Sequence, residues 1–164
     1  MINGSCLCGG VRFEVQTITG PAEYCHCTRC RKVSGSSALL MIGIKTEGFR
    51  FVSGSELIQS FEAPILYDPP DYKHCFCSIC GSSVPAPEGD WIEIPTGSLD
   101  DDPGLIPDKH IFVELLPEWD SISDGLPQYT VSELVKLRTG HDLRKDFQMK
   151  FHVLPSTDSS NAGD

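Results

Sequence analysis

Short apolar runs, bounded by glycine or polar residues, recur along this chain and predict β-strands. Val11, Phe13 and Val15 alternate with polar neighbours, the period-two pattern of a strand with one buried face. The run 38–44 is almost continuously apolar, which is typical of a strand buried on both faces. Further strands are predicted at 91–94 and 110–114, and a hairpin is predicted from 49–52, Ser-Gly-Ser and 57–61.

Signals for helices are confined to two segments. Thr130 and Glu133 match a capping box that would begin a helix, which Gly140 would end. A second short helix is predicted from Thr28 to Val33, before Ser-Gly. The 12 prolines and 15 glycines punctuate the chain as an all-β domain requires. We therefore expect a mainly β domain over residues 1–155, with one or two short helices and a disordered polar tail over 156–164.

The composition is ordinary for a soluble globular protein, with 40% hydrophobic and 22% charged residues. The first residues have neither the basic nor the apolar region of a secretory signal, and the longest apolar run is too short to cross a bilayer. Eight cysteines kept for metal would also fit a reducing compartment. We expect a cytoplasmic or nuclear location and no membrane partner.

Negative charge is concentrated in one segment. Of the 23 acidic residues, 11 fall within 88–124, where Lys109 is the only base, so this segment (1 − 11 = −10) accounts for the net charge of −10. A field of that sign repels phosphate and argues against nucleic acid as a partner. Positive side chains gather elsewhere, where they would either hold a small anionic ligand or form solvated surface: Arg29, Arg31, Lys32, Lys45 and Arg50.

The cysteines carry the most specific chemical signal in the chain. They fall into three clusters, Cys6-x-Cys8, Cys25-x-Cys27-x2-Cys30 and Cys75-x-Cys77-x2-Cys80. Thiols one or two residues apart can reach the same tetrahedral ion. A disulfide between such near neighbours is strained, because bridged Cα atoms prefer separations of about 5.5 to 6 Å. The spacing therefore predicts metal sites, with zinc as the metal.

The number of thiols permits two arrangements. Two closed tetrahedral sites need eight ligands, whereas seven suffice if one site keeps an open position for substrate or water. Joining Cys6 and Cys8 to the distant Cys77-x2-Cys80 pair would clamp the N-terminal strand to the middle of the chain, as a structural site does. The local trio at 25–30 would then form the open site.

Five segments of the chain together carry a family resemblance. Three are the cysteine motifs, Gly4-Ser-Cys-Leu-Cys-Gly-Gly-Val11, Cys25-His-Cys-Thr-Arg-Cys-Arg-Lys-Val-Ser-Gly35 and Phe76-Cys-Ser-Ile-Cys-Gly81. The other two are His110-Ile-Phe-Val-Glu114 and a segment at 119–127. Together they resemble the GFA family, the glutathione-dependent formaldehyde-activating enzymes and their centromere-protein-V-like members. The resemblance implies a zinc-stapled, tent-like β domain. It also implies a structural zinc on Cys6, Cys8, Cys77 and Cys80, and a second, functional and labile zinc on Cys25, Cys27 and Cys30.

The function that the resemblance implies is a carbon–sulfur lyase activity. The second zinc would activate the thiol of glutathione, or of a similar small thiol, towards formaldehyde or a related aldehyde, giving S-hydroxymethylglutathione. Arg29, Arg31 and Lys32 would offset negative charge or bind the carboxylates of the tripeptide, and Ser34 would offer its hydroxyl. The alternative is a zinc-stabilised interaction or thiol-carrier module without turnover.

Several residues beside these motifs also carry expectations. Cys75 is expected to be a buried free thiol; its alternative role is the fourth ligand of the trio, which would close that site. His26 lies between two ligands and is expected to point away from the metal, facing solvent or transferring protons. Trp91 and Trp119 are expected in the core or in a pocket wall.

Overall fold

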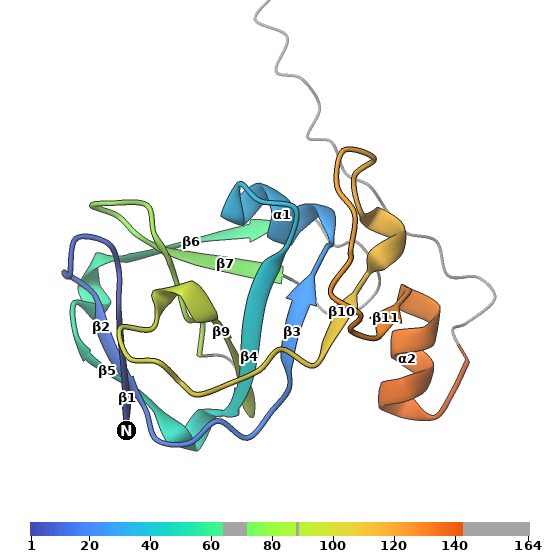
Figure 1. Cartoon of the computed structure of the whole chain (residues 1–164). Helices are drawn as coiled ribbons and strands as arrows, with labels where there is room; N and C mark the ends of the chain where they lie inside the picture. The colour runs from blue at the N-terminus through green and yellow to red at the C-terminus, as the bar shows by residue number, and fades with distance from the viewer. Residues whose placement is uncertain (64–71, 88, 143–164) are drawn as a thin grey trace, which may run out of the picture.

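The computed structural model describes residues 1–63, 72–87 and 89–142, and it is mainly β, as predicted. Three sheets are present (Figure 1). The first has the order β1 (Ile2–Ser5), β2 (Arg12–Val15), β5 (Phe49–Ser53). The second has the order β11 (Gln128–Tyr129), β10 (Lys109–Ile111), β3 (Ala22–Cys25), β4 (Leu39–Lys45), β9 (Trp91–Pro95). The third has the order β6 (Ile58–Ala63), β7 (Tyr72–Cys77), β8 (Ser83–Val84).

The described residues also form two α-helices and four short 3-10 helices. The α-helices are α1 (Thr28–Ser34) and α2 (Val131–Thr139), and the 3-10 helices are η1 (Thr46–Gly48), η2 (Ser55–Leu57), η3 (Thr96–Ser98) and η4 (Val113–Leu115). Both predicted α-helices are therefore confirmed. Thr130 forms the capping box with Glu133, and Gly140 ends α2 with a left-handed φ of 73°. Within the described ranges, neither helix has the length and apolarity needed to span a bilayer.

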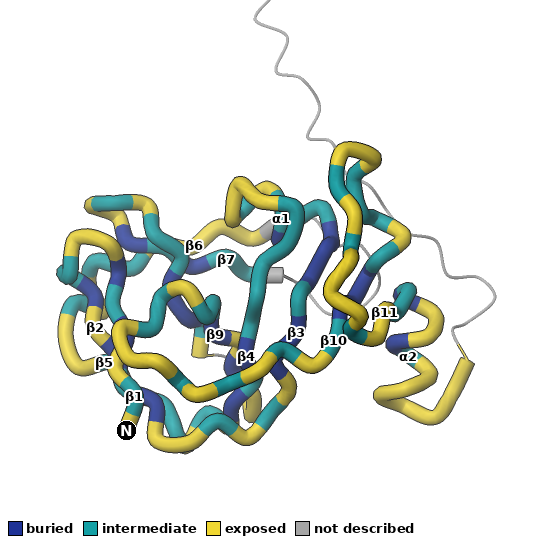
Figure 2. Tube along the Cα trace, in the orientation of Figure 1, coloured by how far each residue is buried: buried dark blue, intermediate teal, exposed yellow. Residues whose placement is uncertain are grey.

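The five-stranded sheet has two unlike faces. On one face Ile42 and Ile44 of β4 pack with Ile92 and Ile94 of β9 and with Phe13 of the first sheet, and all five side chains are buried. Burying one such side chain stabilises the fold by about 1.5 to 3 kcal/mol. The buried segments gather in these strands (Figure 2). This face forms the main hydrophobic core of the domain.

The opposite face is only partly covered. Leu39 and Met41 of β4 are half-buried on it, so the expectation of a strand buried on both faces is wrong for β4. Helix α2 packs Val131 and Leu134 against this face at the β10–β11 end, and the rest of the helix stands beside the sheet (Figure 1). The alternation of β4 therefore separates a core face from a face that lines cavities.

The predicted hairpin of 49–52 with 57–61 is also wrong. Strand β5 pairs with β2, whereas β6 pairs with β7 in another sheet. Gly54, with φ 77°, lies between them, and a Cβ atom there would come within 2.0 Å of the carbonyl oxygen of Gly10. Only glycine permits this close approach, which directs the two strands into different sheets.

The strand predicted at 110–114 ends earlier than expected. Strand β10 stops at Ile111 because Phe112 adopts a left-handed φ of 59°, and η4 follows directly. A buried aromatic residue in this region of φ is an outlier. The predicted tail and residues 143–155 of the predicted domain lie outside the described residues.

Candidate functional site

The sulfur atoms of Cys6, Cys8, Cys77 and Cys80 lie within 4.8 Å of one another. The separation is 3.4 Å between Cys6 and Cys8 and 3.8 Å between Cys8 and Cys77. A zinc ion with Zn–S bonds of about 2.3 Å would hold tetrahedral sulfurs about 3.8 Å apart. The donor set and its spacing therefore fit one zinc ion.

Two glycine turns build this four-sulfur cluster. The first follows β1, where Gly9 has φ 70° and the backbone N–H of Val11 donates to the sulfur of Cys6 at 3.2 Å. The second follows β7, where Gly81 has φ 74° and its N–H donates to the carbonyl of Cys77. Left-handed glycines close both turns at no steric cost. The cluster joins residues 69 positions apart, measured from Cys8 to Cys77.

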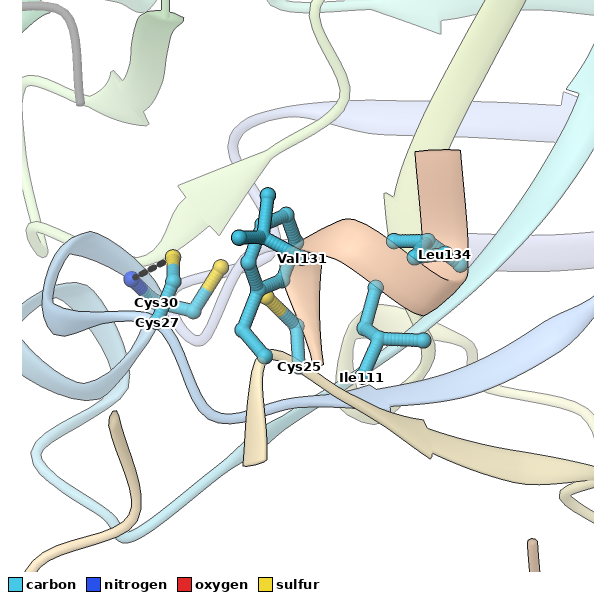
Figure 3. Close-up of a cluster of buried hydrophobic side chains, with 7 residues drawn as sticks. Cys25, Cys27, Cys30, Ile111, Val131 and Leu134 are labelled. Atoms are coloured by element: carbon cyan, nitrogen blue, oxygen red, sulfur yellow. Dashed lines mark hydrogen bonds between the residues drawn. The ribbon is translucent and has the colours of Figure 1, made fainter. Parts of the chain in front are cut away.

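A second sulfur cluster gathers Cys25, Cys27 and Cys30, again within 4.8 Å of one another. Cys25 ends β3, Cys27 is the N-cap of α1, and Cys30 lies in the first turn of that helix. Figure 3 shows the three side chains beside Ile111, with Val131 and Leu134 of α2 in the same cluster. No further Cys, His, Asp or Glu among the described residues joins this trio. The trio therefore fits a metal ion with three protein ligands, the number found in catalytic zinc sites.

Electrostatics within the trio favour one thiolate. Hydrogen bonds from Cys25 and then Cys30 lower the pKa of Cys27 to about 2, and the backbone N–H of Cys30 also donates to this sulfur at 3.4 Å. The hydrogen bond to Cys27 in turn raises the pKa of Cys25 well above its usual value. Without a cation the trio therefore retains thiol protons, which a bound divalent ion would displace.

A buried histidine pair adjoins the trio. The ring of His26 contacts the carbonyl oxygen of Ser37 through Nδ1 at 3.0 Å and Nδ1 of His110 through Nε2 at 2.8 Å. The other ring nitrogen of His110 contacts Asp124 at 2.9 Å. His26 is only 2% exposed, so the expectation that it faces solvent is wrong, whereas it does point away from the trio towards His110.

The chain of three hydrogen bonds ends on two acceptors, the carbonyl of Ser37 and the carboxylate of Asp124. The N–H of Leu126 and the ring of His110 lower the pKa of Asp124, which stays ionised. Burial lowers the pKa of His26, so its imidazole favours the neutral form beside the thiolates.

Two cavities open on the half-covered face of the sheet. One, of about 290 Å³, lies between β4, β9 and the third sheet, and Cys75 and His74 line it. The other, of about 600 Å³, lies between the sheet and α2. Met41, Trp91 and Glu93 line both, so we call the two cavities together the trough. Leu39 and Met41 pack against the buried cluster that contains the trio, and they also line the smaller cavity, so the trough adjoins that cluster.

Most of the other residues predicted for the ligand site lie on helix α1. Of the five predicted cationic residues, Arg29, Arg31 and Lys32 lie on α1 with Cys30, whereas Arg50 pairs with Glu14 and Lys45 lies over the ring of Trp91. The charge of Arg29 helps to lower the pKa of Cys27 after the hydrogen bonds from Cys25 and Cys30. The hydroxyl of Ser34 donates to the carbonyl of Cys30 at 2.8 Å, so it is engaged in the last turn of α1. Arg31 and Lys32 lie in the same final turn.

Three side chains outside the clusters were also assigned from sequence. Cys75 is 8% exposed and belongs to neither sulfur cluster. Trp91 lines the trough as a pocket wall, as predicted. Trp119 is 73% exposed, so its assignment to the core or a pocket wall is wrong.

Sequence reasoning missed four groups that the fold brings to this region: His110, Asp124, Glu23 and Glu93. Glu23 is 7% exposed and pairs with Lys109 and with Arg138 of α2. A signal existed only for the first two, because His110 lies in a motif that resembled the family. Glu93 lies in the acidic segment, which was interpreted as solvated surface, although Asp100 and Asp101 of that segment also accept hydrogen bonds from β1. Glu23 lies outside that segment and carried no signal of its own.

Comparisons with known proteins identify the family to which the chain is similar. Residues 1–115 match the family model described as glutathione-dependent formaldehyde-activating enzyme. A Halomonas elongata protein named "Putative glutathione-dependent formaldehyde-activating enzyme" is 28% identical over 147 residues, covering 81% of this chain and 93% of that protein. A Rhodobacter sphaeroides protein of known crystal structure superposes with a TM-score of 0.49 at 22% identity, over 78% of this chain and 99% of that one.

Proposed function

Since the chain belongs to the family of glutathione-dependent formaldehyde-activating enzymes, we propose that it binds glutathione at the Cys25–Cys27–Cys30 trio and promotes its addition to formaldehyde or a related small aldehyde. The observation that carries the proposal is the pair of sulfur clusters, one with four sulfurs and one with three. A four-sulfur site is closed, whereas three protein ligands leave a coordination position for a substrate sulfur. We further propose that zinc occupies both clusters.

The reaction forms one carbon–sulfur bond. The sulfur of glutathione adds to the carbonyl carbon, the carbon–oxygen π bond breaks, and the proton lost by the thiol ends on the oxygen, giving S-hydroxymethylglutathione. A zinc ion bound by the trio would keep the incoming thiol deprotonated at neutral pH. The charge of Arg29, which helps to lower the pKa of Cys27 after the hydrogen bonds from Cys25 and Cys30, offsets part of the negative charge of the trio.

The peptide part of glutathione needs partners for its carboxylates. Arg29, Arg31 and Lys32 are proposed as those partners, because all three project from α1, the helix that also carries Cys30. The carboxylate of the C-terminal glycine is the group that these cations would neutralise. Ser34 is kept as a weaker candidate, because its hydroxyl already bonds within the helix.

The test is magnetisation exchange by NMR between glutathione, formaldehyde and their adduct, with zinc-loaded protein. The wild-type protein should raise the exchange rate above the uncatalysed background. Cys27→Ser should stay folded, lose one zinc equivalent and return the rate to background, whereas Cys75→Ala should retain the wild-type rate because Cys75 lies outside both clusters. A wild-type rate at background, with zinc present at both clusters, would refute catalysis.

A second candidate function has one observation in its favour. Each cysteine of the trio is only 2% exposed, a burial more usual for a structural site than for one that receives a substrate. The protein would then be a zinc-stabilised interaction or thiol-carrier module. The same experiment separates the two functions, because a module would hold two zinc ions and leave the exchange rate unchanged.

A further inference from the structure

Glu93 is an unusual carboxylate on the open face of the five-stranded sheet. It lies on β9 in register with Gly43 of β4, a residue without a side chain, and it lines both cavities of the trough. Among the residues that the structure describes, no hydrogen bond or ion pair reaches it. Glu23, on the same face, contrasts with it because Lys109 and Arg138 neutralise that carboxylate.

The surroundings of Glu93 suit a cationic ligand group. Burial among the protein atoms of the trough raises its pKa, and the charge of Arg138 opposes that rise. The side chain nevertheless remains open to solvent through the trough. Because Glu93 lines both cavities and is held by no ion pair among the described residues, an ammonium group that enters the trough would pair with it and gain a charge-assisted hydrogen bond.

Arg138 supplies the complementary charge beside it. This residue lies on α2, lines the larger cavity and contacts Glu23 through one nitrogen, and its side chain is 45% exposed. A guanidinium has five N–H donors, so donors remain for a second carboxylate. A negative and a positive side chain facing one cavity form the pattern that recognises a zwitterionic α-amino-acid group.

The trough is also within reach of the trio. Met41 packs against the buried cluster that contains the trio, and it lines both cavities together with Glu93. Eight bonds separate the sulfur of glutathione from the amino nitrogen of its γ-glutamyl group, which spans about 10 Å when extended. The substrate is long enough to join the two places.

On the basis of the function proposed above, we propose that Glu93 is a specificity-determining residue that binds the α-ammonium group of the thiol substrate, with Arg138 binding the adjacent α-carboxylate. The site would then select thiols with a free amino-acid end, and the cations of α1 would meet the other end of the tripeptide. Simple thiols without an amino group would bind weakly.

The experiment is a double-mutant cycle between protein and ligand, measured by calorimetry on zinc-loaded protein. The ligands are glutathione and its deamino analogue, glutaryl-cysteinylglycine. The proteins are wild type, Glu93→Gln and the control Glu56→Gln, which removes an exposed carboxylate that lines neither cavity. A charge-assisted hydrogen bond makes the expected effect about tenfold or more in Kd for the loss of either partner.

We expect the effect of Glu93→Gln on Kd to depend on whether the ligand has an amino group. Wild type and Glu56→Gln should bind glutathione at least tenfold more tightly than the deamino analogue, and Glu93→Gln should bind the two ligands about equally. Equal affinity of wild type for both ligands, or the same loss for both ligands in Glu93→Gln, would overturn the proposal. The comparison of ligands on wild type needs no variant, so equal affinities there overturn the proposal even if Glu93→Gln misfolds. Failure of the proposed function is distinct, since neither ligand would then bind wild type.

Discussion

The two sulfur clusters should differ in how much zinc stabilises the fold through them. A metal ion in the four-sulfur cluster would link residues 69 positions apart, from Cys8 to Cys77. In the trio the largest separation is five positions (30 − 25), from Cys25 to Cys30. An unfolded chain can keep a local trio on its metal, whereas it must close a long loop to keep the distant halves together, so zinc at the four-sulfur cluster favours the folded state more.

The magnitude follows from the loop lengths. The closure entropy scales as (3/2)RT ln n, so loops of 69 and 5 residues differ by about 2.3 kcal/mol. For a chain of 164 residues this corresponds to a difference in Tm of roughly 5 to 9 °C. The fourth cysteine of the larger cluster would add to the difference.

The measurement uses two variants that each keep one cluster. Cys27→Ser/Cys30→Ser keeps the four-sulfur cluster, and Cys6→Ser/Cys8→Ser keeps the trio. Each is unfolded by denaturant with zinc and with chelator, and the increment due to zinc is compared between them. The effects of the serine substitutions on packing cancel, because each increment compares the free energy of unfolding of one variant with zinc and with chelator. An increment in Cys6→Ser/Cys8→Ser that equals or exceeds the other would refute the assignment of the four-sulfur cluster as the structural site.

Three further predictions follow from single contacts. Cys75→Ala should keep the zinc content and the glutathione affinity of wild type, and loss of one zinc equivalent by elemental analysis would instead make Cys75 a ligand. Thr130→Ala should lower the free energy of unfolding by about 1 kcal/mol through loss of the helix cap, while the exposed control Ser132→Ala changes it little; equal losses would show that the cap contributes nothing. Because the N–H of Leu126 and a histidine ring lower the pKa of Asp124 from 3.8, its stabilisation is present above that pH and is lost as the pH falls through the lowered value. The gap in Tm between wild type and Asp124→Asn should therefore narrow in acid, and a gap independent of pH would contradict this.

Local patterns predicted most of the elements correctly. Strand β2 and both helices follow from alternation and from caps, since these depend on residues within one or two turns of each other. The errors occurred where distant contacts decide the result. Gly54 separates β5 from β6 because the backbone of Gly10 packs against it, and Phe112 ends β10 early within a buried cluster. A window of neighbouring residues contains neither contact.

The residues of the candidate site also divide into those predicted by local spacing and those brought together only by the fold. The sequence by itself determined which thiols can share an ion, because one or two intervening residues hold Cys25, Cys27 and Cys30 within coordination range in any compact fold. Only the tertiary structure decided what surrounds them. It brings His110 to His26 across 84 positions and sets Glu93 and Arg138, from β9 and α2, along one trough. Those neighbours depend on strand order and register, which are set by burial of whole sheet faces and leave no local signature.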